Sequence, residues 1–189
     1  MASIFPFEAI RAHRDKVGLV ASRSYINYSK RGLFDRLTGN PYTFLHVLNP
    51  GFSKEMKLPR SRKERFKKIR LRLQSFIEAD YLFKDTKPSF YIYRQDAHGY
   101  TFNGLICGIS VDDYLDGKIK IHEHTIARKE QLFKQYLDIT RFNAEPVLLT
   151  HPKLDAVDKI IAKYARQFPD YDFSTTDTVR HQLWVIDNE

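Results

Sequence analysis

The sequence predicts an α+β fold from three features of its hydrophobic pattern. Residues 61–81 carry apolar side chains at spacings of three and four, which is typical of an amphipathic helix. Residues 89–94 and 100–111 are strand-like runs that flank a Gly-containing turn, which is typical of an antiparallel hairpin. Residues 178–186 predict a final strand. We therefore expect helices together with a mixed or largely antiparallel sheet.

Shorter signals predict the remaining elements of the N-terminal half. Residues 4–20 indicate a short strand or turn, then a polar segment and a small apolar run. Residues 28–38 predict a helix, since Gly39-Asn40-Pro41 would end it. Residues 43–48 predict a strand that ends at Asn-Pro-Gly. In the long helix, Ser61 and Glu64 have capping-box spacing.

Four elements are expected after the hairpin. Residues 119–121 alternate apolar and polar side chains and predict a strand. Residues 125–139 predict a helix with Thr125 at its N-cap. Residues 145–150 predict a strand. Residues 154–164 predict another amphipathic helix.

The composition excludes several classes of protein. Of the 189 residues, 42% are hydrophobic and 25 are Phe or Tyr, so the chain can bury a core. Its single cysteine, Cys107, excludes an internal disulfide framework and lies in an apolar run, so we expect it to pack in the core. With no signal peptide and no membrane-length apolar run, the sequence indicates a cytoplasmic protein without a membrane partner.

The charge is unevenly distributed along the chain. The net charge is +8, but residues 1–72 hold 17 Lys/Arg against 5 Asp/Glu, whereas the rest holds 14 against 18. The excess concentrates in residues 60–72. This segment is interpreted either as a solvated helix face or as a surface for phosphates, nucleic acid or an acidic partner. For the nucleic-acid alternative the candidate residues are Arg62, Lys63, Lys67 and Arg70.

The strongest chemical signal is the run Gly117-Lys-Ile-Lys-Ile-His-Glu-His-Thr125. His122 and His124 lie two residues apart, as in a strand-end metal pair, but the cupin pattern does not continue after them, and we predict no metal site here. Glu123 stands just before a predicted helix N-terminus, which favours an anion such as a carboxylate or a bound phosphate. Arg128 in the first helical turn is suited to neutralise a phosphate. The alternative is a solvated strand end.

Seven segments, in order, resemble a family of conserved proteins of unknown function, family 1015, loosely labelled SpoOJ/ParA/ParB/RepB-like. The segments cover nearly the whole chain, and they are 6–11, 40–47, 87–95, 104–114, 117–125, 145–147 and 183–186. The family usually has a Pro-Pro-Tyr-Asp-like loop near the N-terminus. Here Ser22-Arg-Ser-Tyr-Ile-Asn27 stands in its place, which puts any role of that Asp in doubt.

The resemblance also implies that this chain is an N-terminal portion of a longer protein. Family members continue past the Trp184 strand into an Asp-Gly-His-His-Arg motif, which does not occur before Glu189. That motif is similar to one in ParB-related small-molecule kinases, including free-serine kinases. On this basis residues 1–118 are expected to form an N-terminal α+β region, and residues 119–189 the first half of a ParB-like α/β unit.

The kinase similarity implies roles for particular residues. Glu123 would be the catalytic carboxylate, acting as general base toward a small hydroxyl-bearing substrate or water. Apart from that similarity, the candidates for contact with substrate or phosphate are His122, His124, Thr125, Arg128 and Arg94. ATP or ADP with Mg²⁺ would be the cofactor, used by the full-length protein as a nucleotide-dependent kinase or hydrolase. The alternatives are a DNA-binding, partition-type module that uses the basic helix, and an interaction domain without chemistry.

Overall fold

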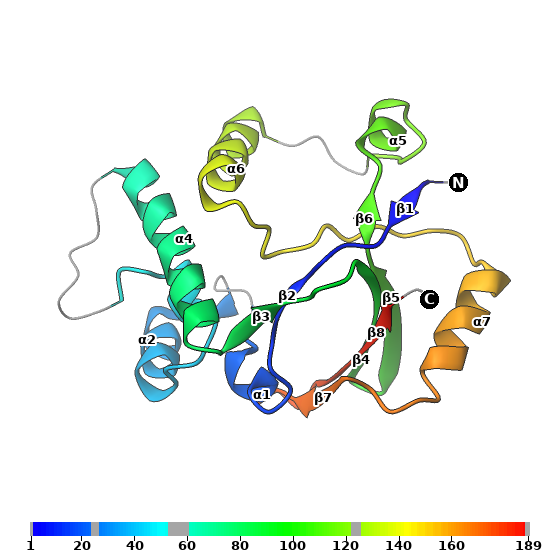
Figure 1. Cartoon of the computed structure of the whole chain (residues 1–189), viewed down its shortest axis with the longest axis horizontal. Helices are drawn as coiled ribbons and strands as arrows, with labels where there is room; N and C mark the ends of the chain where they lie inside the picture. The colour runs from blue at the N-terminus through cyan, green and yellow to red at the C-terminus, as the bar shows by residue number, and fades with distance from the viewer. Residues whose placement is uncertain (1, 24–26, 53–60, 122–125, 188–189) are drawn as a thin grey trace. The chain divides into compact units, whose positions relative to one another are not determined.

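The chain folds into helices and antiparallel strands (Figure 1). The computed structural model describes residues 2–23, 27–52, 61–121 and 126–187. The strands are β1 (Ile4–Phe5), β2 (Ile10–Ala12), β3 (Leu82–Lys84), β4 (Ser89–Ala97), β5 (Tyr100–Ile106), β6 (Gly108–Ile109), β7 (Tyr171–Ser174) and β8 (Arg180–Asp187). The helices are α1 (Val17–Val20), α2 (Lys30–Gly39), α3 (Leu45–Leu48), α4 (Arg62–Glu78), α5 (Val111–Leu115), α6 (Ala127–Thr140) and α7 (Asp155–Tyr164). The predicted α+β fold is confirmed.

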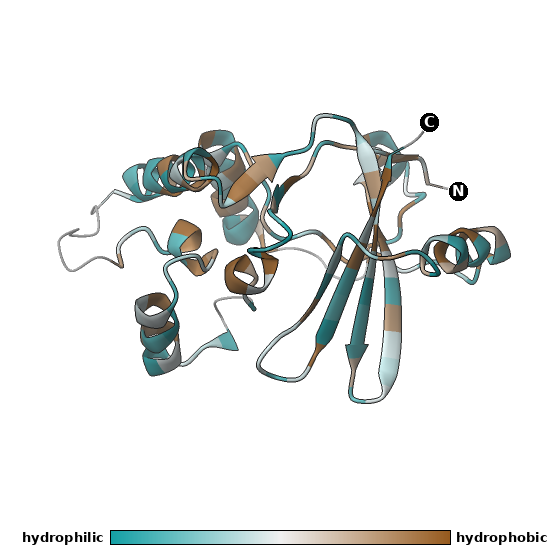
Figure 2. Cartoon of the chain, turned by 60° about the horizontal axis from the view of Figure 1, so that its bottom comes forward, coloured by the Kyte–Doolittle hydropathy of each residue, from teal (hydrophilic) through white to brown (hydrophobic). Residues whose placement is uncertain are grey.

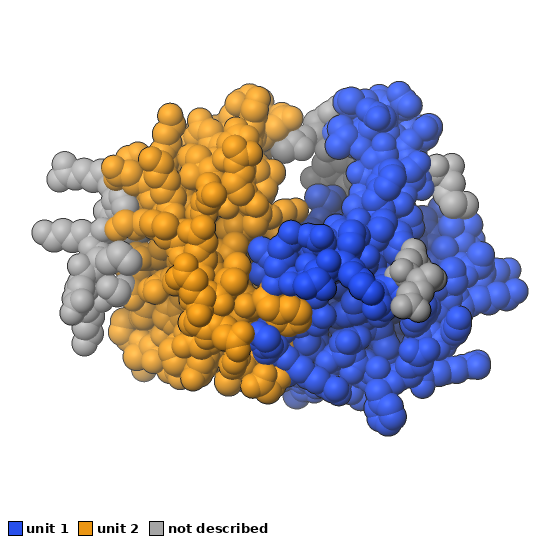
Figure 3. Space-filling model, in the orientation of Figure 1, with its two compact units in different colours: residues 1–14, 84–123, 145–189 blue, residues 15–83, 124–144 orange. Residues whose placement is uncertain are grey.

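The chain divides into two compact units, which Figure 3 distinguishes by colour. Unit 1 comprises residues 1–14, 84–123 and 145–189, and unit 2 comprises residues 15–83 and 124–144. The division of the sequence at residue 118 into an N-terminal region and a ParB-like half stays a prediction.

A four-stranded antiparallel sheet with the order β5-β4-β8-β7 forms the centre of unit 1. Strands β4 and β5 are joined by a two-residue turn, His98-Gly99, whose φ angles are 52° and 81°. Two successive positive φ angles define the tight turn that matches the twist of a hairpin, and glycine adopts the second without strain. The predicted hairpin and the predicted last strand are confirmed, whereas β7 was not predicted.

One face of this sheet carries the hydrophobic core of unit 1. Ile92, Trp184 and Ile186 are buried there, and Ile161 and Tyr164 of α7 pack against them. In Figure 2 the strands are largely hydrophobic where they converge and largely hydrophilic along their middle. Helix α7 therefore follows the predicted amphipathic pattern, with its apolar side on the sheet.

Helices predominate in unit 2, and the longest of them is the predicted basic helix, α4. Its apolar side chains Ile69, Leu73 and Phe76 are buried, as their spacing of four and three predicts. Phe66 of α4 meets Tyr136 of α6 edge to face, with ring centroids 5.4 Å apart. Ser61 lies at the N-cap of α4, although its side chain makes no capping hydrogen bond.

The predicted strand at residues 43–48 is wrong, because this segment forms the short helix α3. Leu45 and Val47 are fully buried, and the Asn49 amide donates to the Leu45 carbonyl at 2.9 Å. A short apolar run suits a buried strand and a buried helix equally well by pattern alone. In the structure both apolar side chains are buried in unit 2, and the segment is a helix and not a strand.

Two further predicted strands, at residues 119–121 and 145–150, are also absent from the described structure. The amides of Lys118 and Ile119 donate to the Asp113 carbonyl, at 3.0 and 3.2 Å, instead of to a neighbouring strand. Val147 and Leu148 are 81% and 87% exposed in an irregular segment. A strand needs a partner for its backbone groups, and an alternating or apolar sequence does not supply one.

Candidate functional site

The predicted catalytic run lies partly outside the described residues. His122, Glu123, His124 and Thr125 belong to the part of the chain that the structure does not describe. The residues on either side of them, up to Ile121 and from Ile126, are described.

The start of this run is fastened to helix α5 through Asp113. The Lys118 ammonium donates to Asp113 Oδ1 at 2.5 Å, and the Ser3 amide donates to Asp113 Oδ2 at 2.6 Å. These hydrogen bonds, the one from Lys118 first, lower the pKa of Asp113 to about 2. Gly117, with φ of 70°, makes the turn between Asp113 and the run. Lys118 thus holds the described start of the run against Asp113.

The described end of the run is the N-terminus of α6. The N-cap position falls on Ile126 and not on the predicted Thr125. Isoleucine has no side-chain acceptor, so it leaves the first amides of the helix without the usual cap. Arg128 and Lys129 are exposed in the first turn. Uncapped amides beside two cations are chemically suited to an anion such as a phosphate.

Arg94 lies on β4 in unit 1. Its Nε donates to Asn103 Oδ1 at 3.0 Å, and its guanidinium carbon lies 5.4 Å from the centre of the Trp184 ring. The side chain is therefore oriented by the neighbouring strands β5 and β8. The Arg94 side chain therefore lies on the same face of the sheet as α7.

The four candidate nucleic-acid residues lie in the first half of α4 and are exposed. Lys63, Lys67 and Arg70 follow one another at spacings of four and three, so they form a single line about 10 Å long. Arg62 lies beside this line. Among the described residues, no ion pair joins any of the four to a carboxylate. We call Lys63, Lys67 and Arg70 the basic stripe.

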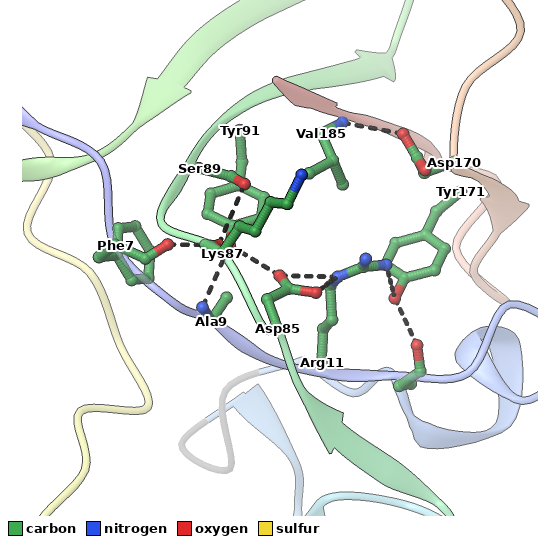
Figure 4. Close-up of polar contacts among 11 residues, drawn as sticks. Phe7, Ala9, Arg11, Asp85, Lys87, Ser89, Tyr91, Asp170, Tyr171 and Val185 are labelled. Carbon is green, nitrogen blue, oxygen red and sulfur yellow. Dashed lines mark hydrogen bonds and ion pairs between the residues drawn. The ribbon is translucent and has the colours of Figure 1, made fainter. Parts of the chain in front are cut away.

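Sequence reasoning missed a buried ion-pair network in unit 1 (Figure 4). Arg11 Nε donates to both oxygens of the buried Asp85, at 2.8 and 2.9 Å, and Arg11 Nη1 donates to the Tyr171 hydroxyl at 2.9 Å. The Tyr91 hydroxyl donates to Asp85 Oδ2 at 2.7 Å and accepts from the Ala9 amide at 3.1 Å. Burial, followed by the bond to Asp85, raises the pKa of Tyr91 to about 12.

This network fastens the N-terminal segment to the sheet. The Tyr171 hydroxyl donates to the Ala12 carbonyl, so both tyrosines hold the backbone on either side of Arg11. Arg11 lies 74 residues before Asp85 and 160 residues before Tyr171 in the sequence. No local spacing links them, and only the fold identifies the pairing.

A second unpredicted network surrounds His181 of β8. The Tyr93 hydroxyl lies 2.6 Å from His181 Nδ1, and Thr175 Oγ1 lies 3.2 Å from Nε2. Because Thr175 donates to Asp177 Oδ1 at 2.5 Å, its oxygen accepts from Nε2–H and Tyr93 donates to Nδ1. Burial lowers the pKa of His181, which favours this neutral tautomer.

Three other observations bear on the expected chemistry. Cys107 is half-buried, and burial raises the pKa of its thiol, which disfavours the reactive thiolate. The described residues include no group of three His, Cys, Asp or Glu side chains that could hold a metal ion. No helix in the described part of the chain has the length and hydropathy required to cross a bilayer.

The antiparallel sheet with its packed helix, together with the helical unit, defines an α+β protein. The chain belongs to the family described as "Protein of unknown function (DUF1015)", whose model matches residues 4–189. Membership of family 1015, predicted from the ordered segments, is confirmed. Neither the curated proteins nor the solved structures contain a match to the chain.

Proposed function

We propose that the full-length protein transfers a phosphoryl group from a nucleotide to a small hydroxyl-bearing substrate or to water. The observation that carries this proposal is the N-terminus of α6, where no described side chain caps the helix at Ile126 and where Arg128 and Lys129 are exposed. Glu123 precedes the helix by four residues. The similarity of the His122-Glu123 pair to that of ParB-related small-molecule kinases supports the same assignment.

In this proposal the phosphates of ATP or ADP bind at the first turn of α6. The helix amides and the Arg128 guanidinium offset the negative charge, which is the main protein contribution to phosphoryl transfer. Glu123 accepts the proton of the attacking hydroxyl, with His122, His124 and Thr125 near it in sequence. Mg²⁺ would accompany the nucleotide and offset the charge of its phosphates.

Glu123→Gln tests the catalytic part of the proposal. Removing a general base is expected to lower turnover by roughly 10²–10⁴-fold with little change in nucleotide affinity. Glu130→Gln removes the same charge one turn into α6 and is the matched control. Unchanged turnover in Glu123→Gln would reject Glu123 as the base.

The phosphate-binding part has a separate test by isothermal titration with ATP. Arg128→Gln is expected to weaken binding by about tenfold, which corresponds to roughly 1.4 kcal/mol. Lys134→Gln, exposed further along the same helix, is expected to leave affinity unchanged. Absence of nucleotide binding by the full-length protein would reject the proposal as a whole.

A second candidate function is binding to the DNA backbone through the basic stripe. It is favoured by the exposure and alignment of Lys63, Lys67 and Arg70, and by the charge of unit 2. Unit 2 holds 19 Lys/Arg and 8 Asp/Glu, a net charge of +11, whereas unit 1 holds 12 and 15, a net charge of −3. These values sum to the net charge of +8.

Fluorescence anisotropy with duplex DNA at several salt concentrations tests this candidate. Each phosphate contact contributes about 0.9 to the slope of log affinity against log salt, so replacing the whole stripe by Gln should reduce the slope by up to about 2.7. Replacing Lys153, Lys159 and Lys163 by Gln removes equal charge from unit 1. If both triple variants have an equal effect, or if binding does not depend on salt, the basic stripe is not a specific DNA-binding surface.

A further inference from the structure

Unit 2 contains a pocket of about 400 Å³ beside the second half of α4. This volume is within the range of small-molecule sites, which is about 300–1,000 Å³. Its wall includes Pro41, His46, Arg72, Ser75, Phe76 and Tyr81. None of these residues belongs to the candidate catalytic run or to the basic stripe.

Arg72 is a half-buried cation in this wall. Within the described ranges, no carboxylate or other acceptor pairs with its guanidinium. A partly buried charge without a partner retains its desolvation cost, so an anion that enters the pocket gains more here than at an exposed arginine. Arg70, two positions earlier on the same helix, is exposed and provides that comparison.

His46 adds a neutral polar group to the pocket. Its Nε2 donates to the Asn40 carbonyl at 3.1 Å, which leaves the lone pair of the neutral ring on Nδ1. Burial lowers the pKa of His46, and the charge of Arg72 lowers it further. In its neutral form the histidine adds no second positive charge beside Arg72.

Two aromatic side chains, Phe76 and Tyr81, also line the pocket. The Phe76 and Tyr81 rings meet edge to face with centroids 5.4 Å apart, and Tyr42 supports Tyr81 from 4.9 Å. Phe76 is buried, so its ring is fixed by the packing of α4. An inorganic anion would use Arg72 but leave these apolar surfaces without a contact.

We propose that this pocket binds a small organic anion, with its carboxylate or phosphate paired to Arg72 and its apolar body against Phe76 and Tyr81. Among the described residues Arg72 is a half-buried cation without an acceptor, and it shares one pocket with the fixed aromatic wall. It goes beyond the phosphoryl-transfer proposal, because neither Glu123 nor Arg128 takes part.

Calorimetric titration of the protein with phenyl phosphate, benzoate, inorganic phosphate and benzyl alcohol tests the inference. We expect phenyl phosphate or benzoate to bind at least tenfold more tightly than either inorganic phosphate or benzyl alcohol. The preferred organic anion identifies which headgroup the pocket takes. Equal binding of inorganic phosphate would overturn the role of the aromatic wall, and equal binding of benzyl alcohol would overturn the role of the charge.

Matched variants assign the effect to Arg72. Arg72→Met should weaken binding of the organic anion at least tenfold, whereas Arg70→Met should change it less than twofold. Equal affinity in Arg72→Met and the parent protein, or an equal loss in both variants, would overturn the inference. Glu123→Gln should leave binding of the organic anion unchanged. Failure of the pocket inference is therefore distinguishable from failure of the phosphoryl-transfer proposal.

A measurement on the unaltered protein covers the case in which Arg72→Met does not fold. The NMR signal of the His46 ring should shift in a saturable manner during titration with phenyl phosphate or benzoate. The ring of the exposed His151 serves as the internal reference. A His46 signal that does not move, or that moves no more than that of His151, would overturn the inference.

Discussion

Asp85 shows at the scale of one residue how this protein fastens its N-terminus. The carboxylate is 9% exposed and accepts hydrogen bonds from Arg11 and Tyr91, which come from two separate segments. A buried carboxylate that is paired and fully hydrogen-bonded organises its surroundings, even when its net contribution to stability is modest.

Asp85→Asn should therefore be strongly destabilising. The change leaves Arg11 in a half-buried site without its countercharge, and we expect a loss of about 2–4 kcal/mol in the free energy of unfolding. Asp155→Asn, at a position where the carboxylate is 81% exposed, should cost less than about 1 kcal/mol. Urea unfolding measures both, and similar losses would show that the network does not fasten the segment.

His181 provides a prediction on pH at the same scale. Burial lowers its pKa below the ordinary value of 6.5, so below that pH the unfolded chain binds a proton that the folded protein does not. Stability should fall as pH decreases through 6.5 toward the folded pKa, and it should be fully regained above 6.5. His46 acts in the same direction.

Urea unfolding between pH 7.5 and 5.5 measures this dependence. His181→Gln removes one of the two titrations and should flatten the pH profile, while His46 retains the remainder. His151→Gln, at an exposed histidine, should leave the profile unchanged. A profile as steep in His181→Gln as in the parent protein would contradict the assignment.

At the scale of elements, α7 shows how amphipathic spacing becomes packing. Ile161 contacts the cluster of Ile92, Trp184 and Ile186, whereas the adjacent Ile160 is 52% exposed. Two neighbouring residues of the same type therefore lie in different environments. The difference follows from the 100° rotation between successive residues of a helix.

Ile161→Ala should destabilise unit 1 by about 1–2 kcal/mol, because it removes partly buried methyl groups that pack on the sheet. Ile160→Ala should change stability by less than about 0.5 kcal/mol, since its site is half in solvent. Thermal and urea unfolding give both values. A larger effect at Ile160 would mean that the opposite face of α7 is the packed one.

At the scale of the whole molecule, charge is partitioned between the two units. The net charge of unit 2, +11, exceeds that of the entire chain, because unit 1 carries −3. Concentrated like charge destabilises a compact state by self-repulsion, and dissolved salt screens that repulsion.

Raising the salt concentration from about 0.02 to 0.3 M should therefore stabilise unit 2 against local unfolding more than unit 1. We expect amide hydrogen exchange in α4 and α6 to slow relative to exchange in β4 and β8. Exchange measured by NMR at both concentrations checks this. An equal response of both sets of amides would show that the charge partition has no effect on local stability.

The sequence by itself determined the elements whose signals are local. Periodic spacing of apolar residues predicted α4, α7 and β8. A glycine between two strand-like runs predicted the turn at His98-Gly99. Family membership was likewise readable from ordered segments along nearly the whole chain. The uneven charge was also evident from the residues alone.

Only the tertiary structure decided what depends on distant partners. Within residues 43–48 the buried helix α3 forms in place of a strand, and residues 119–121 and 145–150 have no partner strand in the described part of the chain. Arg11 reaches Asp85 across 74 residues, and the Arg72 pocket joins the end of α4 to His46. Such contacts arise from the packing of whole elements, which no local spacing encodes.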